Sequence, residues 1–172
     1  IKSVIGIDVG IKSLATVSNG LTFVAPNTLK YLENKLKFYQ RRQAKCVKGS
    51  NGFRKWKRKI AVLWNRITNI KNDYLHKLSL QLVKNHDLIV VENLKVKNMV
   101  KNHKLARAIS NMSWGEFFRQ IEYKSEWHGK HFVKVDPKGT SQKCSCCGFA
   151  NKSLTLSDRH WKCPECHSVL DR

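Results

Sequence analysis

Apolar residues near the start of the chain fall in two short runs that predict β-strands. The first run extends from Ile1 to Ile7, and the second is Leu14-Ala15-Thr16-Val17. Gly10, Asn19 and Gly20 punctuate these runs, and glycine and asparagine are residues that tight turns favour. We therefore expect two strands that pair as a hairpin.

The next segment changes to a helical period. Apolar residues at Leu32, Leu36 and Tyr39 lie three or four positions apart, until the turn sequence Gly49-Ser50-Asn51-Gly52 ends the pattern. Steps of three and four then resume over some 30 residues, from Phe53 to Leu82. At 1.5 Å per residue such a helix is about 45 Å long. We predict a helical hairpin that projects beyond the sheet.

The second half of the chain predicts two more strands and a helix. Leu88-Ile89-Val90-Val91 is typical of a central strand buried on both faces. Ser113-Trp114-Gly115-Glu116 has the spacing of a capping box and precedes a helix. We expect the aromatic residues of that helix, Trp127 among them, to lie in the core. A short strand follows from His131 to Val135.

Four cysteines near the end of the chain have the spacing of a tetrahedral zinc site. Their pattern is C-x2-C-x15-C-x2-C, formed by Cys144, Cys147, Cys163 and Cys166. A closed, structural Zn²⁺ is expected, because each pair can present two thiolates from one knuckle. Two disulfides or chance placement are the alternatives, although nothing else suggests a secreted chain. His160 and His167 could replace a ligand, but four cysteines already complete the shell.

The charge balance favours a polyanionic partner. The sequence has 33 Lys and Arg against 12 Asp and Glu, a formal charge of +21, and self-repulsion on this scale destabilises an unpartnered compact state. Nucleic acid is the leading partner, and an anionic membrane surface is the alternative. No stretch of 18 apolar residues and no signal peptide is found. We therefore expect no membrane partner and an intracellular, cytoplasmic location. Both ends of the chain look like cuts in a longer protein.

The predicted hairpin carries the densest positive charge. Between Lys30 and Lys59 there are twelve basic residues and one acidic residue, Glu33, with aromatic residues interleaved. One interpretation is a solvated helix face. The other is a clamp that binds the phosphate backbone without reading sequence. The expected contacts of such a clamp are Arg41, Arg42, Arg54, Lys57 and Arg58.

Two acidic residues, Asp8 and Glu92, each follow a hydrophobic strand. If both strands belong to one sheet, these carboxylates could converge at one edge and bind Mg²⁺ or Mn²⁺ through oxygen. Two such ions about 4 Å apart would activate water and stabilise the leaving oxygen of a phosphodiester. A turn-forming role for Asp8 and an ion pair between Glu92 and Lys95 are the alternatives.

Three segments of the chain form an ordered set. They are Ile5-Gly6-Ile7-Asp8-Val9-Gly10, then Val90-Val91-Glu92-Asn93-Leu94, then Thr140-Ser141-Gln142-Lys143-Cys144 leading into the four cysteines. This set resembles the TnpB family of transposon-encoded RNA-guided nucleases, which are related to the compact type V CRISPR effectors. The resemblance covers nearly the whole chain as the RuvC-like nuclease half of such a protein.

The resemblance implies an α/β fold of the RNase H-like (RuvC) type, a mixed sheet with an inserted basic helical hairpin and a C-terminal zinc ribbon. It implies a nuclease core at residues 1–139, with the hairpin at about 28–85, a ribbon at 140–170 and the start of a final motif at 171–172. Asp8 and Glu92 would be catalytic carboxylates that bind magnesium. The third would be the residue after Arg172, and Asp171 is a weaker candidate.

The implied activity is RNA-guided DNA cleavage by a two-metal carboxylate mechanism, with DNA and a guide RNA as partners. Without the family's N-terminal part and its third carboxylate, this chain is expected to bind nucleic acid non-specifically and to cleave poorly. The alternative is a non-catalytic, basic zinc-ribbon module that binds nucleic acid. Asp8-Val9-Gly10-Ile11-Lys12 also weakly matches a phosphate-binding turn of sugar kinases and actin-like ATPases. The oligomeric state is not evident from the sequence.

Overall fold

A computed structural model of the chain describes residues 1–139, 142–155, 158 and 160–171. Thr140, Ser141 and Arg172, which belong to the motifs singled out above, lie outside the described residues. The chain divides into two compact units. The sheet unit comprises Ile1–Val91 and Lys95–Val133, and the cysteine unit comprises Glu92–Leu94 and Lys134–Arg172.

A mixed five-stranded sheet has the strand order β3-β2-β1-β4-β5. The first two strands pair in antiparallel fashion, with Ile7 beside Val17, which confirms the predicted hairpin. β1 and β4, which are far apart in the sequence, pair in parallel. The strands are β1 Val4–Asp8, β2 Ala15–Val17, β3 Thr22–Phe23, β4 Leu88–Glu92 and β5 His131–Val135.

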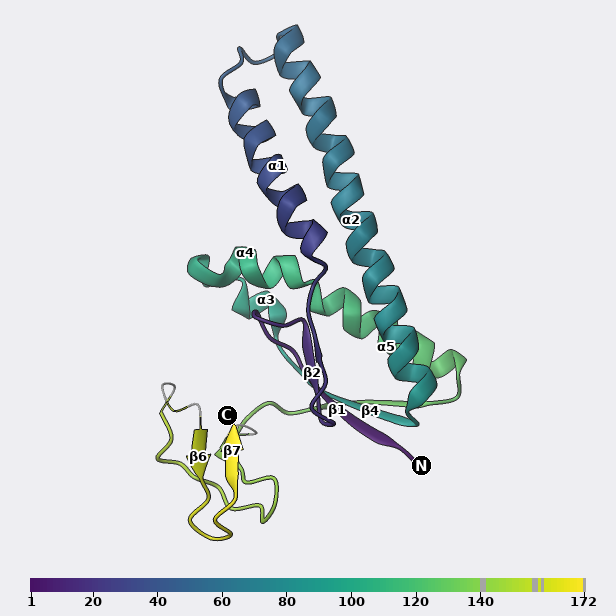
Figure 1. Ribbon diagram of the computed structural model, residues 1–172, viewed down its shortest axis with the longest axis vertical. Helices are drawn as coiled ribbons and strands as arrows, with labels where there is room; N and C mark the ends of the chain where they lie inside the picture. Colours follow the sequence, from purple (N-terminus) through teal and green to yellow (C-terminus); the bar gives the residue numbers. More distant parts are fainter. Residues whose placement is uncertain (140–141, 156–157, 159, 172) are drawn as a thin grey trace. The chain divides into compact units, whose positions relative to one another are not determined.

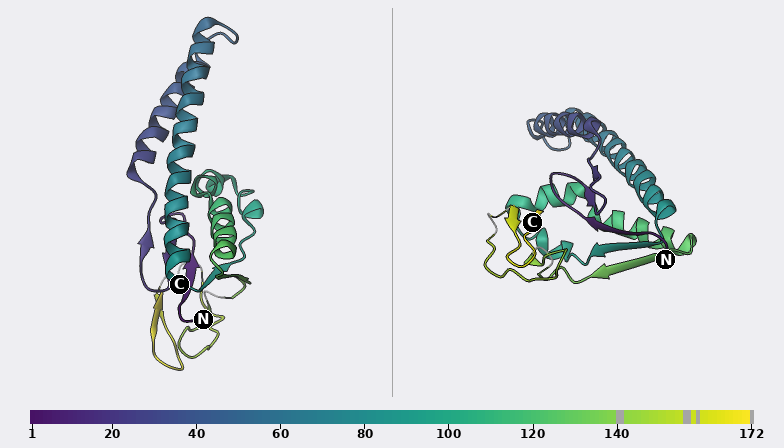
Figure 2. Two further views of the ribbon diagram at one scale, coloured as in Figure 1. Left: turned by 90° about the vertical axis from the view of Figure 1, so that its right-hand side faces the viewer. Right: turned by 60° about the horizontal axis from the view of Figure 1, so that its bottom comes forward.

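Burial alternates along the two parallel strands. Ile5 and Ile7 of β1 are buried, and so are their partners in β4, Ile89 and Val91. The residues between them are less buried, so the prediction that β4 is buried on both faces is wrong. The physical reason is that the helices gather on one side of the sheet (Figure 2). β4 is an interior strand, as expected, because it lies between β1 and β5.

Asp87 joins the starts of three strands. Its carboxylate accepts hydrogen bonds from the backbone N–H groups of Lys2 and Ser3, at 2.7 and 3.2 Å, and from the Lys130 ammonium. Its own carbonyl accepts a bond of 2.8 Å from the backbone of His131. The Lys130 hydrogen bond, followed by the two backbone bonds, holds the pKa of Asp87 well below its usual range. The residue before β4 thereby ties that strand to β1 and β5.

The predicted helical hairpin is confirmed as α1 (Asn27–Ala44) and α2 (Asn51–Asn85), which lie side by side in Figure 1. Ser50 caps the second helix, because its hydroxyl accepts a hydrogen bond of 3.2 Å from the backbone of Phe53. The helices pack through a continuous apolar seam. Its buried residues are Leu29, Leu32, Leu36, Leu63 and Ile67.

The helix predicted after residue 113 is α5 (Trp114–Trp127). Only some of the residues expected in the core are buried. Phe117 and Ile121 are fully buried, but Trp127 is 77% exposed. The prediction that Trp127 belongs to the core is therefore wrong, because this last helical residue lies beyond the covered stretch. α3 (Val96–Met99) and α4 (His103–Met112) fall in a basic segment for which no element was predicted.

The expected capping box before α5 is not formed. Ser113 has a positive φ of 56° and makes no capping hydrogen bond through its side chain. Glu116, the other half of the expected box, instead accepts hydrogen bonds from Arg119 and Gln120 farther along the helix. The left-handed turn at Ser113 directs the chain away from the geometry that a capping box needs.

A buried polar cluster joins α2 to α5. The Lys124 ammonium donates hydrogen bonds to the carbonyl of His76, at 2.8 Å, and to the hydroxyl of Ser79, at 2.7 Å. Desolvation lowers the pKa of Lys124. Because its donors have partners, this lysine can lie almost wholly inside the helix packing, at 6% exposure.

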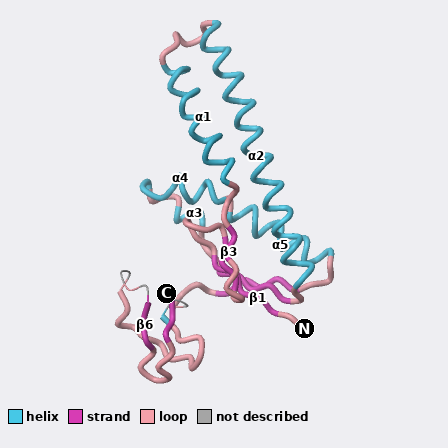
Figure 3. The backbone as a smooth tube through the Cα atoms, in the orientation of Figure 1, coloured by secondary structure: helices cyan, strands magenta, loops and turns pink. Residues whose placement is uncertain are grey.

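The cysteine unit consists largely of loops (Figure 3). Its two short strands, β6 (His160–Lys162) and β7 (Val169–Asp171), pair in antiparallel fashion. The buried cluster of this unit is formed by Cys144, Trp161 and Cys163. None of the helices in the described part of the chain is both long enough and apolar enough to cross a membrane.

Candidate functional site

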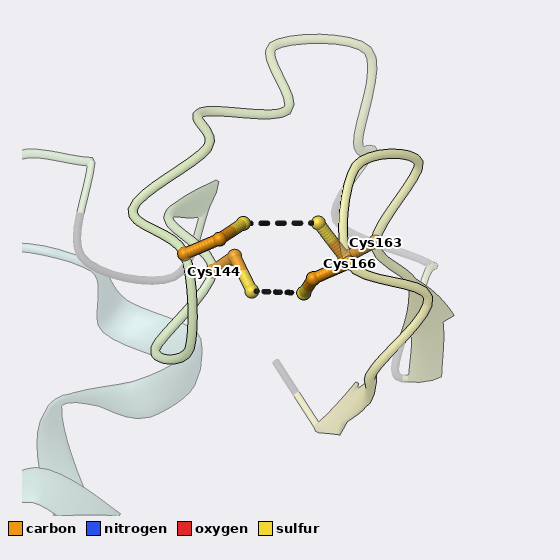
Figure 4. Close-up of side chains that lie close together, drawn as sticks. Cys144, Cys163 and Cys166 are labelled. Atoms are coloured by element: carbon orange, nitrogen blue, oxygen red, sulfur yellow. Dashed lines mark hydrogen bonds between the residues drawn. The ribbon is translucent and has the colours of Figure 1, made fainter.

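The four predicted cysteines lie together in the cysteine unit. Their Sγ atoms are all within 4.8 Å of one another, and the Sγ atoms are 3.5 Å apart between Cys144 and Cys166 and between Cys147 and Cys163 (Figure 4). A disulfide bond is about 2.0 Å long, so the alternative of two disulfides is excluded, and all four cysteines are free. Sulfurs around a tetrahedral Zn²⁺ are about 3.8 Å apart for Zn–S bonds of about 2.3 Å. The set fits such an ion.

The first knuckle is closed by two backbone hydrogen bonds. The N–H of Gly148 donates to the carbonyl of Cys144 at 2.9 Å, and the N–H of Cys144 donates to the carbonyl of Phe149 at 2.8 Å. Gly148 has a φ of 78°, a left-handed conformation that glycine adopts without steric cost. The turn keeps the two thiols of this pair pointing to one side.

The second knuckle repeats this pattern with histidine in the place of glycine. His167 donates to the carbonyl of Cys163 at 3.0 Å, and Cys163 donates to the carbonyl of Ser168 at 2.9 Å. His167 has a φ of 60°. The metal-ligand cluster found among the described residues contains the four cysteines and neither His167 nor His160. His167 is thus a turn residue of the knuckle.

The thiols differ in burial and in protonation. Cys144 and Cys163 are buried, whereas Cys147 and Cys166 are exposed. Hydrogen bonds with the side chain and backbone of Ser168 lower the pKa of Cys166 to about 6. A backbone hydrogen bond with Phe149 lowers the pKa of Cys147, but desolvation and the neighbouring thiols together raise it to about 12. A bound cation would favour the ionised form of all four thiols, because its positive charge would offset the repulsion between these closely spaced negative charges.

The predicted carboxylates occupy the ends of paired strands. Asp8 is the last residue of β1 and is exposed, and Glu92 is the last residue of β4 and is half-buried. The residues just before them, Ile7 and Val91, are partners in the parallel register. The two strands therefore end at the same edge of the sheet. Asp171 is the last residue of β7, and its side chain lies outside the described part of the structure.

The predicted nucleic-acid contacts fall into two groups. Arg54 and Arg58 line a groove of about 640 Å³ on the helical hairpin, whereas Arg41, Arg42 and Lys57 are exposed outside it. We call this feature the hairpin groove. Its lining residues are Lys35, Tyr39, Arg54, Lys55, Arg58, Lys59, Val62, Leu63 and Arg66.

Sequence reasoning missed four of the cations that line the groove, Lys35, Lys55, Lys59 and Arg66. A usable pattern was nevertheless present, because Arg54 and Arg58 are four positions apart, and so are Lys55 and Lys59. Residues spaced in this way lie on one face of a helix. Counting basic residues identified the segment, but only this spacing distinguishes the groove from the other faces.

Comparison with known proteins defines the family. The family model OrfB_IS605, described as "Probable transposase", matches residues 1–103, more than half of the chain. A second model, described as "Cas12f1-like, TNB domain", matches residues 114–172. The chain belongs to the OrfB_IS605 family, and the resemblance to TnpB proteins is confirmed.

Two of the curated relatives are named as putative RNA-guided DNA endonucleases. The chain is 41% identical over 169 residues to the "Putative RNA-guided DNA endonuclease" of Streptomyces pristinaespiralis, covering 98% of the chain and 42% of the relative. It is 39% identical over 176 residues to the "Putative RNA-guided DNA endonuclease InsQ" of Escherichia coli, covering 94% and 44%. The chain thus spans less than half the length of these relatives.

A solved structure shares the fold. The chain in "Cryo-EM structure of the Cas12f1-sgRNA-target DNA complex" aligns with a TM-score of 0.63 at 20% sequence identity. The alignment covers 98% of this chain and 46% of the Cas12f1 chain. The mixed α/β architecture is therefore that of part of Cas12f1.

Proposed function

We propose that this chain is the nuclease part of an RNA-guided DNA endonuclease, in which Asp8 and Glu92 hold catalytic Mg²⁺ or Mn²⁺. The observation that carries the proposal is the parallel pairing of β1 with β4, since these strands end at the two carboxylates. The names of the relatives support the same activity. DNA and a guide RNA are the partners proposed for the whole protein, which acts inside the cell.

The strand register supports a shared site for two residues that are far apart in the sequence. Ile7 and Val91 are paired and both buried, and side chains alternate between the faces of a strand. Asp8 and Glu92, each one position later, face the opposite side on neighbouring strands. Neighbouring strands are about 4.8 Å apart, so the carboxylates can share oxygen ligands around a hard divalent ion.

Asp8 and Glu92 would hold the ions, which would supply water activation and charge stabilisation at the leaving oxygen of the phosphodiester. The role of the chain is to hold the carboxylates at one edge of the sheet and to attract the polyanionic substrate with its positive charge. We propose an RNase H-like (RuvC) core at residues 1–139, with the hairpin at about 28–85 as an insertion. The third carboxylate is proposed to follow Arg172 in the parent protein, with Asp171 as the weaker candidate.

The four cysteines are proposed to bind one structural Zn²⁺ in a ribbon at residues 140–170. A complete set of four thiolates leaves no open position, so the ion would hold the two knuckles together and take no part in hydrolysis. The donor set supports Zn²⁺ over a hard cation, because thiolates are soft ligands.

Cleavage of labelled DNA tests the proposal. The chain, extended through its natural ends and purified with its co-expressed RNA, is expected to cut in Mg²⁺. Asp8→Ala and Glu92→Ala should reduce cleavage by about a hundredfold or more, because either change removes an ion ligand. Asp73→Ala is the matched control, since this exposed carboxylate of α2 pairs with Lys77.

Two results would count against the nuclease. Undiminished cleavage by Asp8→Ala would remove the carboxylates from the mechanism. Tight, salt-sensitive binding without cleavage by any form of the extended protein would favour the alternative of a binding module.

A further inference from the structure

A cavity of about 240 Å³ lies in the sheet unit and shares no lining residue with the hairpin groove. Its walls come from the loop between β1 and β2, the linker between β3 and α1, both hairpin helices and the end of α4. We call it the linker pocket, after the linker residues Val24, Ala25 and Pro26 that line it. Pockets for drug-sized ligands measure about 300–1,000 Å³. The linker pocket therefore suits a small molecule and cannot enclose a nucleic-acid strand.

Three lysines from three different segments line the linker pocket. Lys12 comes from the loop after β1, Lys30 from α1 and Lys71 from α2. Among the described residues, Glu33 is the one acid in the lining. The pocket thus has an excess of two positive charges. A phosphate monoester, with a charge of about −1.5 to −2 at neutral pH, matches this excess better than a singly charged carboxylate does.

Lys71 differs from the other two lysines in its burial. Its side chain is only 17% exposed, whereas Lys12 and Lys30 are exposed. Its ammonium lies 3.8 Å from a carboxylate oxygen of Glu33, which is longer than a hydrogen bond, and it has no hydrogen-bond partner among the described residues. Desolvation lowers the pKa of Lys71, although Glu33 opposes this effect. A buried cation without a hydrogen bond is costly, so an anion bound in the pocket would offset that cost.

The start of α1 adds positive potential to the same pocket. Pro26 and Asn27 both line it, and Pro26 occupies the N-cap position of the helix. Pro26 supplies no capping hydrogen bond from its side chain, and the first turn contains no acidic residue. The N–H groups of an uncapped first turn favour a nearby anion. The helix start therefore reinforces the charge of the three lysines.

The remaining lining residues are apolar or uncharged. Leu14 and Leu29 are buried, and Met112 is half-buried. Asn27 and Asn111 contribute amide groups, which can both donate and accept hydrogen bonds. Apolar walls gain free energy when they cover an apolar body. A ligand that fits this lining has an anionic group joined to an apolar or flat body with a few polar atoms.

We propose that the linker pocket binds a small organic phosphate ester about the size of a mononucleotide. Its phosphate group contacts Lys12, Lys30 and Lys71, and its body lies against the apolar walls. Lys12 also ends the segment Asp8-Val9-Gly10-Ile11-Lys12, which weakly matches a phosphate-binding turn. The site accordingly gives this segment a role that the proposed nuclease function does not use.

Calorimetric titration of the chain tests the site. The probes are the four ribonucleoside monophosphates, their nucleosides and inorganic phosphate, in buffer without divalent metal ions. Lys71→Met removes the ammonium but keeps an unbranched apolar side chain. Lys77→Met is its matched control, because this lysine of the same helix is 76% exposed and pairs with Asp73. Lys30→Gln and Lys37→Gln form a second matched pair, since both are exposed lysines of α1 and Lys37 lies outside the pocket. Circular dichroism verifies that all variants fold.

At least one monophosphate should bind saturably, about tenfold or more tightly than its nucleoside and than inorganic phosphate. Lys71→Met should weaken that binding by about tenfold or more, because it removes a charged hydrogen-bond donor. Lys30→Gln should weaken it by about threefold or more. Lys77→Met and Lys37→Gln should each change it by less than about twofold.

Three results would overturn the proposal. The first is the absence of saturable binding by all four monophosphates at millimolar concentration. The second is an equal loss in Lys71→Met and Lys77→Met, since binding would then follow diffuse charge. The third is equal affinity for a monophosphate and its nucleoside, which would remove the phosphate from recognition. Because the assay contains no divalent metal and leaves Asp8 and Glu92 unchanged, its failure is distinguishable from failure of the cleavage test.

Discussion

The sheet unit and the cysteine unit are stabilised in different ways. In the sheet unit, strands and helices bury an extensive apolar core that includes Ile5, Ile89 and Phe117. In the cysteine unit the buried cluster is Cys144, Trp161 and Cys163, so two of its three members are thiols. A module with so small a core needs a further source of stability. The first unit is stabilised by apolar burial, and we propose that metal binding stabilises the second.

The largest expected effect is that of Cys163→Ser on the cysteine unit. Binding of a structural Zn²⁺ is worth about 10–16 kcal/mol in small zinc modules, so loss of a buried ligand should release the ion and unfold this unit. Metal content per chain and proteolysis of residues 134–172 measure the effect. Cys146→Ser is the control, because this exposed thiol lies outside the cluster. Retention of one zinc per chain by Cys163→Ser would contradict the ligand assignment.

Truncation of a large apolar side chain should destabilise the sheet unit and leave the cysteine unit unaffected. Phe117→Ala removes a fully buried ring and should lower the free energy of unfolding of the sheet unit by about 3–5 kcal/mol. Zinc content should not change. Trp127→Ala, at the exposed end of the same helix, should cost less than about 1 kcal/mol. Denaturant unfolding followed by helical circular dichroism reports on the sheet unit, since the described helices all belong to it. Similar costs for both variants would contradict the assigned burial.

Acid should weaken the sheet unit through Glu116. The hydrogen bond from Arg119 is the main cause that lowers the pKa of Glu116 from 4.5 to about 2. A carboxyl group whose pKa is lower in the folded state than in the unfolded state makes its full contribution to stability above its unfolded pKa. That contribution should disappear as the pH falls from about 5 towards 2. Glu116→Gln should flatten this pH dependence, whereas Glu126→Gln, an exposed residue of the same helix, should leave it unchanged. Identical pH profiles for Glu116→Gln and the unmodified chain would contradict this.

The smallest expected effects distinguish the two knuckles. Gly148→Ala places a side chain at a φ of 78°, where an added Cβ meets no atom within 4 Å, so its cost of about 1 kcal/mol should come from the backbone alone. His167→Gly should instead relieve a similar conformation and tighten metal retention by up to about fivefold. Competition with a chelator measures both. Weaker retention in His167→Gly would show that the imidazole contributes more than a turn.

Elements with strong local patterns were predictable from the amino-acid sequence. The four cysteines, the turn at Gly49-Ser50-Asn51-Gly52 and the apolar steps of the long helix each depend on neighbours only a few positions apart. Local geometry decides which face such residues occupy, so periodicity is enough to predict them. The weaker, basic pattern before residue 113 concealed α3 and α4.

Which distant segments meet depends on how the elements pack in the folded chain. The pairing of Ile7 with Val91, the burial of Lys124 against α2 and the exposure of Trp127 all depend on contacts between elements far apart in the sequence. The hairpin groove likewise requires cations from two helices. A local pattern can assign a residue to a face of its own element, but the surroundings of that face arise only when the elements pack.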